Sequence, residues 1–223
     1  MAERSFSPLS SRRKYRDAKL IVIATEGEST EPTYFEDLAF DDRFRHPRVD
    51  IRVIPAISGL SSPKHVIDRL DEIRRESGLY QGDELWLVID KDRWKDRMLS
   101  EVAQKVRQKG YHLADSNPCF EIWLLLHKKS LDDYTPQEQK ELKENRRSQP
   151  RSSRTRLEKE LMDICGSYDK RNLNTSHYLP HLDSAIENAD NADTECDTRW
   201  LNSLGSRVYK LAQSIVDSSP NNT

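Results

Sequence analysis

The sequence predicts an α/β protein with a parallel sheet of about four strands flanked by helices, followed by a mainly helical C-terminal extension. From residue 18 to about residue 130, short apolar segments alternate with segments of helical periodicity. The first apolar segment is uninterrupted, as in a strand buried on both faces. Beyond residue 130 the strand-like segments stop, and helices and loops remain.

We expect three parts of the chain. Residues 1–17 read as a flexible basic arm, because they offer Ser, Pro, Arg and Lys but no periodic apolar face. Residues 18–130 are expected to form the α/β core. Residues 131–223 are expected to form a helical region that packs on this core and contains a basic segment at 140–159.

The first strand and helix follow from the patterns at residues 19–40. "KLIVIATEG" is continuously apolar until it reaches Glu26, which is typical of a strand buried on both faces. In "STEPTYFEDLAF", Thr30 is a candidate cap and Pro32 lies in the first turn, where proline is tolerated. A strand therefore leads into a helix within a few residues, and glutamates occupy the turn between them.

The next strand is "VDIRVIPA", and the helix "SGLSSPKHVIDRLDEIRRESG" follows it, ending at Gly78. Its apolar residues recur at helical spacing: Val66, Ile67, Leu70 and Ile73. A third strand, "DELWLVIDKD", ends in acids, and the helix "MLSEVAQKVRQKG" follows it up to Gly110. Strands alternating with helices imply parallel pairing.

A fourth short strand, "YHLADS", precedes the helix "NPCFEIWLLLHKK". Asn117 suits the cap of this helix and Pro118 its first position, so the helix is expected to begin directly after the strand. The final helix is expected from Trp200 to Val216. Its apolar stripe should pack back on the core: Leu204, Val208, Leu211 and Ile215.

Composition excludes several protein classes. The net charge of −2 gives no global attraction to nucleic acid or membrane, so local charge must be considered instead. The three cysteines, Cys119, Cys165 and Cys196, form no CxxC pair, which argues against a disulfide framework or a thiolate zinc site. No apolar run approaches the roughly 18 residues that a membrane-spanning helix needs. We therefore expect a cytoplasmic protein without a membrane partner.

Two predicted strands end in carboxylates, Glu26 after the first and Asp90 and Asp92 after the third. The carboxyl ends of parallel strands lie on one edge of a sheet, so these groups meet if the two strands are neighbours. Clustered carboxylates repel one another unless a cation neutralises them, and oxygen ligands suit Mg²⁺ or Mn²⁺. The alternative is that these acids are ordinary helix caps.

Three segments resemble the RloB family, also called AbiLii-like abortive-infection proteins. They are "EGESTEPTYF" at 26–35, "VIDKD" at 88–92 and "NPCFEIWLLLH" at 117–127. A weaker resemblance continues in "SYDK" at 167–170 and "RVYKL" at 207–211. The three strong segments lie in the family's order within the predicted α/β core.

The resemblance implies a Toprim-like domain, the small parallel α/β domain of topoisomerases, bacterial primases and overcoming-lysogenization-defect nucleases. By matching position, Glu26 is the motif glutamate, and Asp90 and Asp92 are the DxD pair. The family's further motif positions fall on Glu28, Glu31, Asn117, Glu121 and His127. Of these, Glu28 and Glu121 are expected as metal ligands and the other three as supporting residues.

The resemblance also implies an effector nuclease of antiphage defence that uses Mg²⁺ or Mn²⁺ and works with a separate ATPase sensor. The chain has no GxxxxGK[ST] loop, so that ATPase is expected to be another protein. The alternative is a non-catalytic partner-binding module with a structural metal site. Whether copies of the chain form a homo-oligomer stays open.

The basic segment at 140–159 is a candidate nucleic-acid interface, because its cations would release condensed counterions on binding a phosphate backbone. The candidates are Arg146, Arg147, Arg151, Arg154 and Arg156. The alternative is a solvated loop of high charge. Further cations in "KDRWKDR" lie near the predicted carboxylate site.

Overall fold

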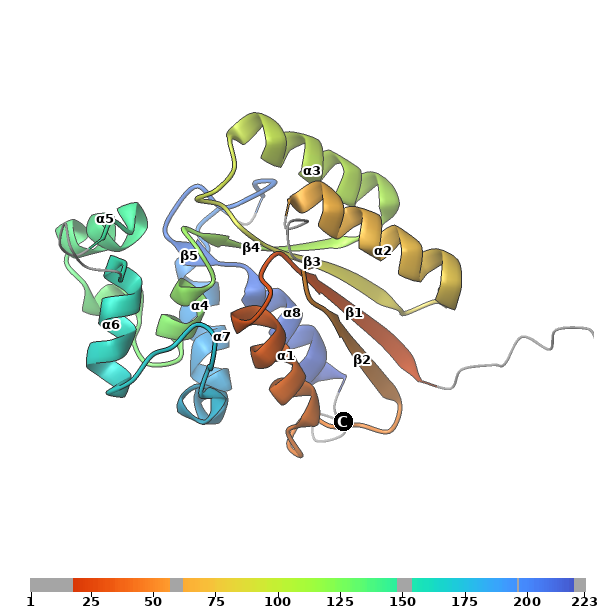
Figure 1. Ribbon diagram of the computed structural model, residues 1–223, viewed down its shortest axis with the longest axis horizontal. Coiled ribbons are helices and arrows are strands. Elements are labelled where there is room, and N and C mark those ends of the chain that lie inside the picture. Colours follow the sequence, from red (N-terminus) through yellow and green to blue (C-terminus); the bar gives the residue numbers. More distant parts are fainter. Residues whose placement is uncertain (1–17, 57–61, 148–153, 196, 219–223) are drawn as a thin grey trace, which may run out of the picture.

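The computed structural model of the protein describes residues 18–56, 62–147, 154–195 and 197–218. The arm predicted at residues 1–17 lies outside the described residues, and so does Arg151. Within the described residues, a central sheet carries helices on both faces (Figure 1). The predicted fold class is confirmed.

The central sheet has five strands: β1 (Lys19–Thr25), β2 (Val49–Ile54), β3 (Glu84–Asp90), β4 (His112–Asn117) and β5 (Gly205–Ser206). Their spatial order is β2-β1-β3-β4-β5; the first four are mutually parallel and β5 pairs antiparallel to β4. β1 and β3 are direct neighbours, with Thr25 opposite Val88. This adjacency places Glu26 next to the end of β3.

Eight helices accompany the sheet in the described part of the chain: α1 (Thr30–Phe40), α2 (Pro63–Ser77), α3 (Asp96–Lys109), α4 (Glu121–Leu126), α5 (Pro136–Glu144), α6 (Arg156–Cys165), α7 (Leu182–Ala192) and α8 (Val208–Asp217). Short 3₁₀ turns lie at Leu131–Asp133, Thr175–His177 and Leu179–His181. Helices α2 and α3 cover one face of the sheet, and α1 and α8 cover the other (Figure 1).

Alternating residues of each central strand enter two separate cores. In β1, Leu20 and Val22 pack with α2 and α3, whereas Ile21 and Ile23 pack with α1, α4 and α8. All four side chains are fully buried. Burial on both faces explains the uninterrupted apolar run of this strand, because successive side chains point to opposite faces.

The helices after α4 extend the second of these cores. Buried Leu157 of α6, Leu182 of α7 and Leu211 of α8 belong to the same apolar cluster as Trp123 of α4. The Asn188 amide of α7 also donates to the Leu126 carbonyl, at 2.8 Å. The C-terminal helices thus close over α4 and the adjoining face of the sheet.

The predicted start of the helix at Asn117 is wrong. Asn117 is the last residue of β4, a cis peptide bond joins it to Pro118, and α4 begins at Glu121. The Asn117 amide donates to the carbonyls of Asn202 and Ser203, at 2.8 and 2.7 Å. A contact with a distant loop therefore takes the side chain that would otherwise cap a helix.

The predicted final helix from Trp200 also begins too early. Gly205 and Ser206 form β5 against β4, and α8 starts at Val208. The Leu201 N–H donates to a carboxylate oxygen of buried Asp115, at 2.6 Å. Pairing with the sheet thus holds this segment in extended form.

Composition led us to expect neither a disulfide framework nor a membrane-spanning helix. Cys119 and Cys165 are free thiols. None of the helices in the described residues has the length and apolar character needed to cross a membrane.

Candidate functional site

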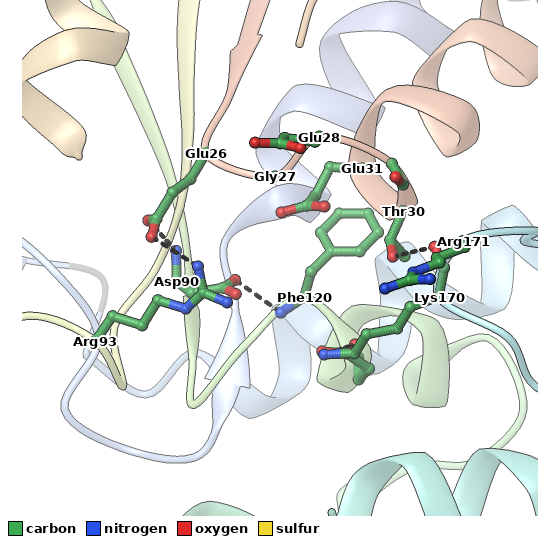
Figure 2. A pocket seen from close by; sticks show the side chains of 12 residues that line it. Glu26, Gly27, Glu28, Thr30, Glu31, Asp90, Arg93, Phe120, Lys170 and Arg171 are labelled. Atoms are coloured by element: carbon green, nitrogen blue, oxygen red, sulfur yellow. Dashed lines mark hydrogen bonds and ion pairs between the residues drawn. The ribbon is translucent and has the colours of Figure 1, made fainter. Parts of the chain in front are cut away.

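A cavity of about 270 Å³ lies at the carboxyl edge of the sheet. Figure 2 shows Asp90 and Arg93 on one side of it and Lys170 and Arg171 on the other. Its lining comes from the β1–α1 turn, the end of β3, the start of α4 and a distant C-terminal segment: Glu26, Gly27, Glu28, Ser29, Thr30, Glu31, Asp90, Arg93, Phe120, Glu121, Lys170 and Arg171.

Glu26, the first residue after β1, is buried but incompletely hydrogen-bonded. Its Oε2 accepts from the Asp90 backbone N–H at 3.3 Å and from the Trp94 indole N–H at 3.0 Å. Within the described residues its Oε1 has no hydrogen-bond partner, and the Arg93 guanidinium lies 3.6 Å away. Burial raises the pKa of Glu26. One buried oxygen therefore remains available to a ligand.

Asp90, the last residue of β3, accepts a 2.8 Å hydrogen bond from the Phe120 backbone N–H. Burial, reinforced by the negative charges around it, raises the pKa of Asp90 well above its ordinary value. Those charges are Glu31, Glu121, Glu26 and Asp92. Full ionisation of this cluster is costly without a cation.

Glu31, in the first turn of α1, is buried and points toward the turn after β1. Burial, together with Glu121 and Glu26, raises the pKa of Glu31 to about 7. A Cβ atom on Gly27 would overlap the Glu31 carboxylate, so glycine leaves the space that this carboxylate occupies. The turn sequence thus positions a carboxyl group that titrates near neutral pH.

Glu121, at the start of α4, is buried and strongly hydrogen-bonded. It accepts from the Tyr168 hydroxyl at 2.8 Å and lies 2.8 Å from the Lys170 ammonium. Burial opposes its ionisation, but Lys170, Cys119 and Tyr168 outweigh that effect and lower its pKa. Glu121 is therefore an ionised acid with its own counter-ion, unlike Glu31.

Two predicted metal ligands lie at or beyond the edge of the cavity. Glu28 lines it but is exposed. Asp92 is exposed and outside the lining, and its backbone N–H donates to the Pro118 carbonyl at 3.0 Å. Its charge still contributes to the raised pKa of Asp90. The acids that face the cavity are thus Glu26, Glu28, Glu31, Asp90 and Glu121.

The carboxylates that line the cavity are suitable ligands for a hard divalent cation. All of them offer carboxylate oxygens, the ligands that Mg²⁺ and Mn²⁺ prefer, and the buried Oε1 of Glu26 lacks a partner among the described residues. In the described part of the chain, no three Asp, Glu, His or Cys side chains converge closely enough to hold an ion. Ion binding therefore requires these side chains to approach one another.

Two predicted supporting residues lie away from the cavity lining. Asn117 joins β4 to the loop before β5, as described above. His127 is fully buried, and its Nδ1 and Nε2 lie 2.9 Å from the Trp123 carbonyl and the Tyr34 hydroxyl. The carbonyl only accepts, so Nδ1 carries the proton and Nε2 accepts from Tyr34. Burial lowers the pKa of His127 to about 3, so it is neutral.

The predicted basic interface separates into different environments. Arg146 is 81% exposed and pairs with Glu144 at 3.2 Å. Arg156 pairs with Glu160 at 2.5 Å within α6. Arg154 is exposed and lies close to the cavity, in a groove that shares Lys170 and Arg171 with it. Arg147 forms an isolated β-bridge with Thr155.

Several contributors to the cavity were not predicted from the sequence. They are Trp94, Tyr168, Lys170 and Arg171, whereas Arg93 is one of the cations of "KDRWKDR" expected near the carboxylates. The tail segment "SYDK", which ends at Lys170, signalled two of them through the family resemblance. Spacing alone did not signal any of the tail residues, because they lie far along the chain from the acids they contact.

One comparison with known proteins gives a match. A family model described as RloB-like protein matches residues 21–215, which include every residue that lines the cavity. No curated protein and no solved structure matches the chain.

Proposed function

This chain belongs to the RloB-like family, and on that premise we propose that it is a metal-dependent nuclease. It would hydrolyse phosphodiester bonds in RNA, with transfer RNA among the candidates, or in DNA, as an effector of antiphage abortive infection. The observation that carries this proposal is the cavity at the carboxyl edge of the sheet, where several acids with raised pKa values meet.

Glu26, Asp90 and Glu121 would hold Mg²⁺ or Mn²⁺, with Glu28 and Asp92 at the rim and Glu31 beside them. A bound divalent cation would neutralise these carboxylates, orient the phosphodiester and lower the pKa of a water molecule. The Oε1 of Glu26 has no hydrogen-bond partner among the described residues, which supports its role as a ligand. Asp90 Oδ1 is held in place by the Phe120 N–H, which supports a fixed contact on that side.

A general base completes the proposal. Efficient proton transfer needs a pKa near the working pH, and Glu31, at about 7, meets that condition. Glu26 also has a raised pKa and is the second candidate. In this assignment, the Glu31 carboxylate would accept the proton of the attacking water, and Glu26, Asp90 and Glu121 would hold the ion.

The proposal is tested by incubating purified protein with Mn²⁺ and labelled total RNA, transfer RNA and DNA. Asp90→Asn should reduce cleavage at least about 100-fold, because it removes a ligand. Asp68→Asn is the matched control, since Asp68 is an exposed acid of α2 outside the cavity. Manganese binding is measured separately by thermal unfolding. A wild type that neither cleaves nor binds Mn²⁺, with or without native-host proteins, would show that the proposal is wrong.

The native-host proteins matter because a separate ATPase sensor is proposed as the partner. Cleavage that appears only after proteins co-purifying from the native host are added would support this activation. Asp90→Asn should abolish that cleavage too.

One observation favours a second function, a non-catalytic partner-binding module with a structural metal site. Lys170 already neutralises Glu121, so part of the acidic cluster is balanced by a cation of the protein itself and does not require a catalytic ion. Under this alternative, Asp90→Asn would retain partner capture, and the wild type would bind Mn²⁺ without any cleavage.

A further inference from the structure

A second hollow adjoins the carboxylate cavity. It is a groove of about 650 Å³ lined by Arg154, Glu158, Tyr168, Asp169, Lys170 and Arg171. Lys170 and Arg171 line both hollows, so the two adjoin at these residues. Figure 2 shows both side chains on the side of the cavity opposite Asp90 and Arg93.

Three cations, Arg154, Lys170 and Arg171, line the groove together with two acids, Glu158 and Asp169. The Lys170 side chain is 47% exposed, and Arg171 and Arg154 are both exposed. In the described part of the chain Arg171 makes no side-chain ion pair; its backbone N–H donates to Asp169 at 2.9 Å. A phosphate backbone that approaches the acidic cavity is repelled unless cations lie beside it. The groove supplies those cations on one side.

The segment that carries these cations is fixed at three places. The Thr30 hydroxyl of α1 donates to the Lys170 carbonyl at 3.0 Å. The Tyr168 hydroxyl donates to Glu121 of α4, and the Lys170 ammonium lies 3.1 Å from Glu158 of α6. Three separate helices therefore hold the segment, and Arg171 projects from a defined position at the junction.

The size of the cavity limits what can enter it. Its volume of about 270 Å³ lies at the lower end of the roughly 300 to 1,000 Å³ that small-molecule sites occupy. One nucleotide unit of an unpaired strand suits that space, whereas a base-paired duplex does not. The rest of the strand must then lie outside, where the groove adjoins the cavity.

We propose that the groove binds the backbone of a single-stranded nucleic acid whose next phosphodiester lies in the carboxylate cavity. Arg171 is the positioning residue nearest the cavity, and Arg154 contacts the strand further along. The proposal rests on the proposed nuclease function, because it places the substrate of that same site.

The test measures binding of labelled oligonucleotides of about 12 nucleotides by fluorescence anisotropy. Single-stranded RNA, single-stranded DNA and the corresponding duplex are compared at several salt concentrations. The protein is the full chain carrying Asp90→Asn, in which cleavage is blocked. Arg171→Ala and Arg154→Ala are added to it separately. Arg75→Ala is the matched control, since Arg75 is exposed near the end of α2 and outside both hollows.

Each groove substitution should weaken single-strand binding about tenfold and lower the slope of log K against log salt by about 0.7. Arg171→Lys should restore the slope, because it keeps the charge. Arg75→Ala should change neither quantity. Unchanged affinity in both groove variants, equal affinity for the duplex, or no binding of any probe would each overturn the proposal.

These outcomes are separate from those that test the nuclease. If wild-type protein cleaves with Mn²⁺ but Arg171→Ala binds the strand normally, the groove assignment is wrong and the nuclease stands. If strand binding depends on Arg171 but the wild type neither binds Mn²⁺ nor cleaves, the nuclease is wrong and the groove stands.

Discussion

Among single residues, Glu31 links the chemistry of the cavity most directly to stability. Burial, with Glu121 and Glu26 nearby, raises its pKa from 4.5 to about 7. Between these values the folded state holds a proton that the unfolded state releases. The contribution of protonated Glu31 to the free energy of unfolding is complete below pH 4.5 and is lost as the pH rises through about 7. It amounts to about 3 kcal/mol at most.

We predict that Glu31→Gln removes this pH dependence. The free energy of unfolding in urea, measured without divalent cations from pH 5 to pH 8, should fall for the wild type relative to the variant. The difference between the proteins is the quantity to follow. The pKa of His127 is lowered from 6.5 to about 3, so below pH 6.5 the unfolded state binds a proton that the folded state does not. This lowers the free energy of unfolding of both proteins equally as the pH falls. A difference that stays constant with pH would contradict the prediction.

The buried pair of Tyr34 and His127 supports stability rather than the cavity. Tyr34→Phe leaves the Nε2 acceptor of His127 buried without a donor, which should cost about 1–3 kcal/mol. Manganese affinity should not change. Tyr168→Phe is the matched comparison, because its hydroxyl donates to Glu121 in the cavity. That variant should change both stability and Mn²⁺ affinity. Equal effects of the two variants on Mn²⁺ binding would contradict this division.

At the scale of elements, the turn between β1 and α1 is the part whose backbone shapes the site. A methyl group on residue 27 would overlap the Glu31 carboxylate, which is the far end of a movable side chain. Gly27→Ala should therefore cost only about 1 kcal/mol of stability, but lower Mn²⁺ affinity about tenfold.

A double-mutant cycle tests that turn. In a Glu31→Ala background the methyl group meets no carboxylate, so Gly27→Ala should have no further effect on Mn²⁺ affinity. Isothermal titration of all four proteins measures the coupling. Equal losses in both backgrounds would mean that residue 27 acts on the site by another route.

At the scale of the whole molecule, the sheet and the C-terminal helices share one core. Residues 122–126 of α4 are fully buried, and they pack in one cluster with α6, α7 and α8. Removing those helices exposes large apolar side chains, each worth about 1.5–3 kcal/mol when buried. Domains are stable by only roughly 5–15 kcal/mol. Exposing several of these side chains therefore costs more free energy than the whole stability of the domain.

We therefore predict that a fragment of residues 1–130 does not fold alone. Circular dichroism should show no cooperative thermal transition for this fragment, and mixing it with residues 131–223 should restore one. The full chain is the control. A sharp transition for the isolated fragment would show that the α/β part is independently stable.

The sequence by itself determined the local features of this protein. The uninterrupted apolar run of Leu20 to Ala24 marked a strand buried on both faces, and the acids at Glu26 and Asp90 marked the ends of two strands. Such features depend on side-chain periodicity along a few residues, which local backbone geometry dictates. The order of elements and the carboxyl edge of the sheet could be predicted for the same reason.

Only the tertiary structure decided which residues share the site. It made β1 and β3 neighbours, left Asp92 outside the cavity lining, and buried His127 in the core. It also brought Lys170 and Arg171 to acids that precede them by about 50 residues or more. Packing selects contacts between residues distant in sequence, and burial by those contacts sets their pKa values. Spacing along the chain carries neither kind of information.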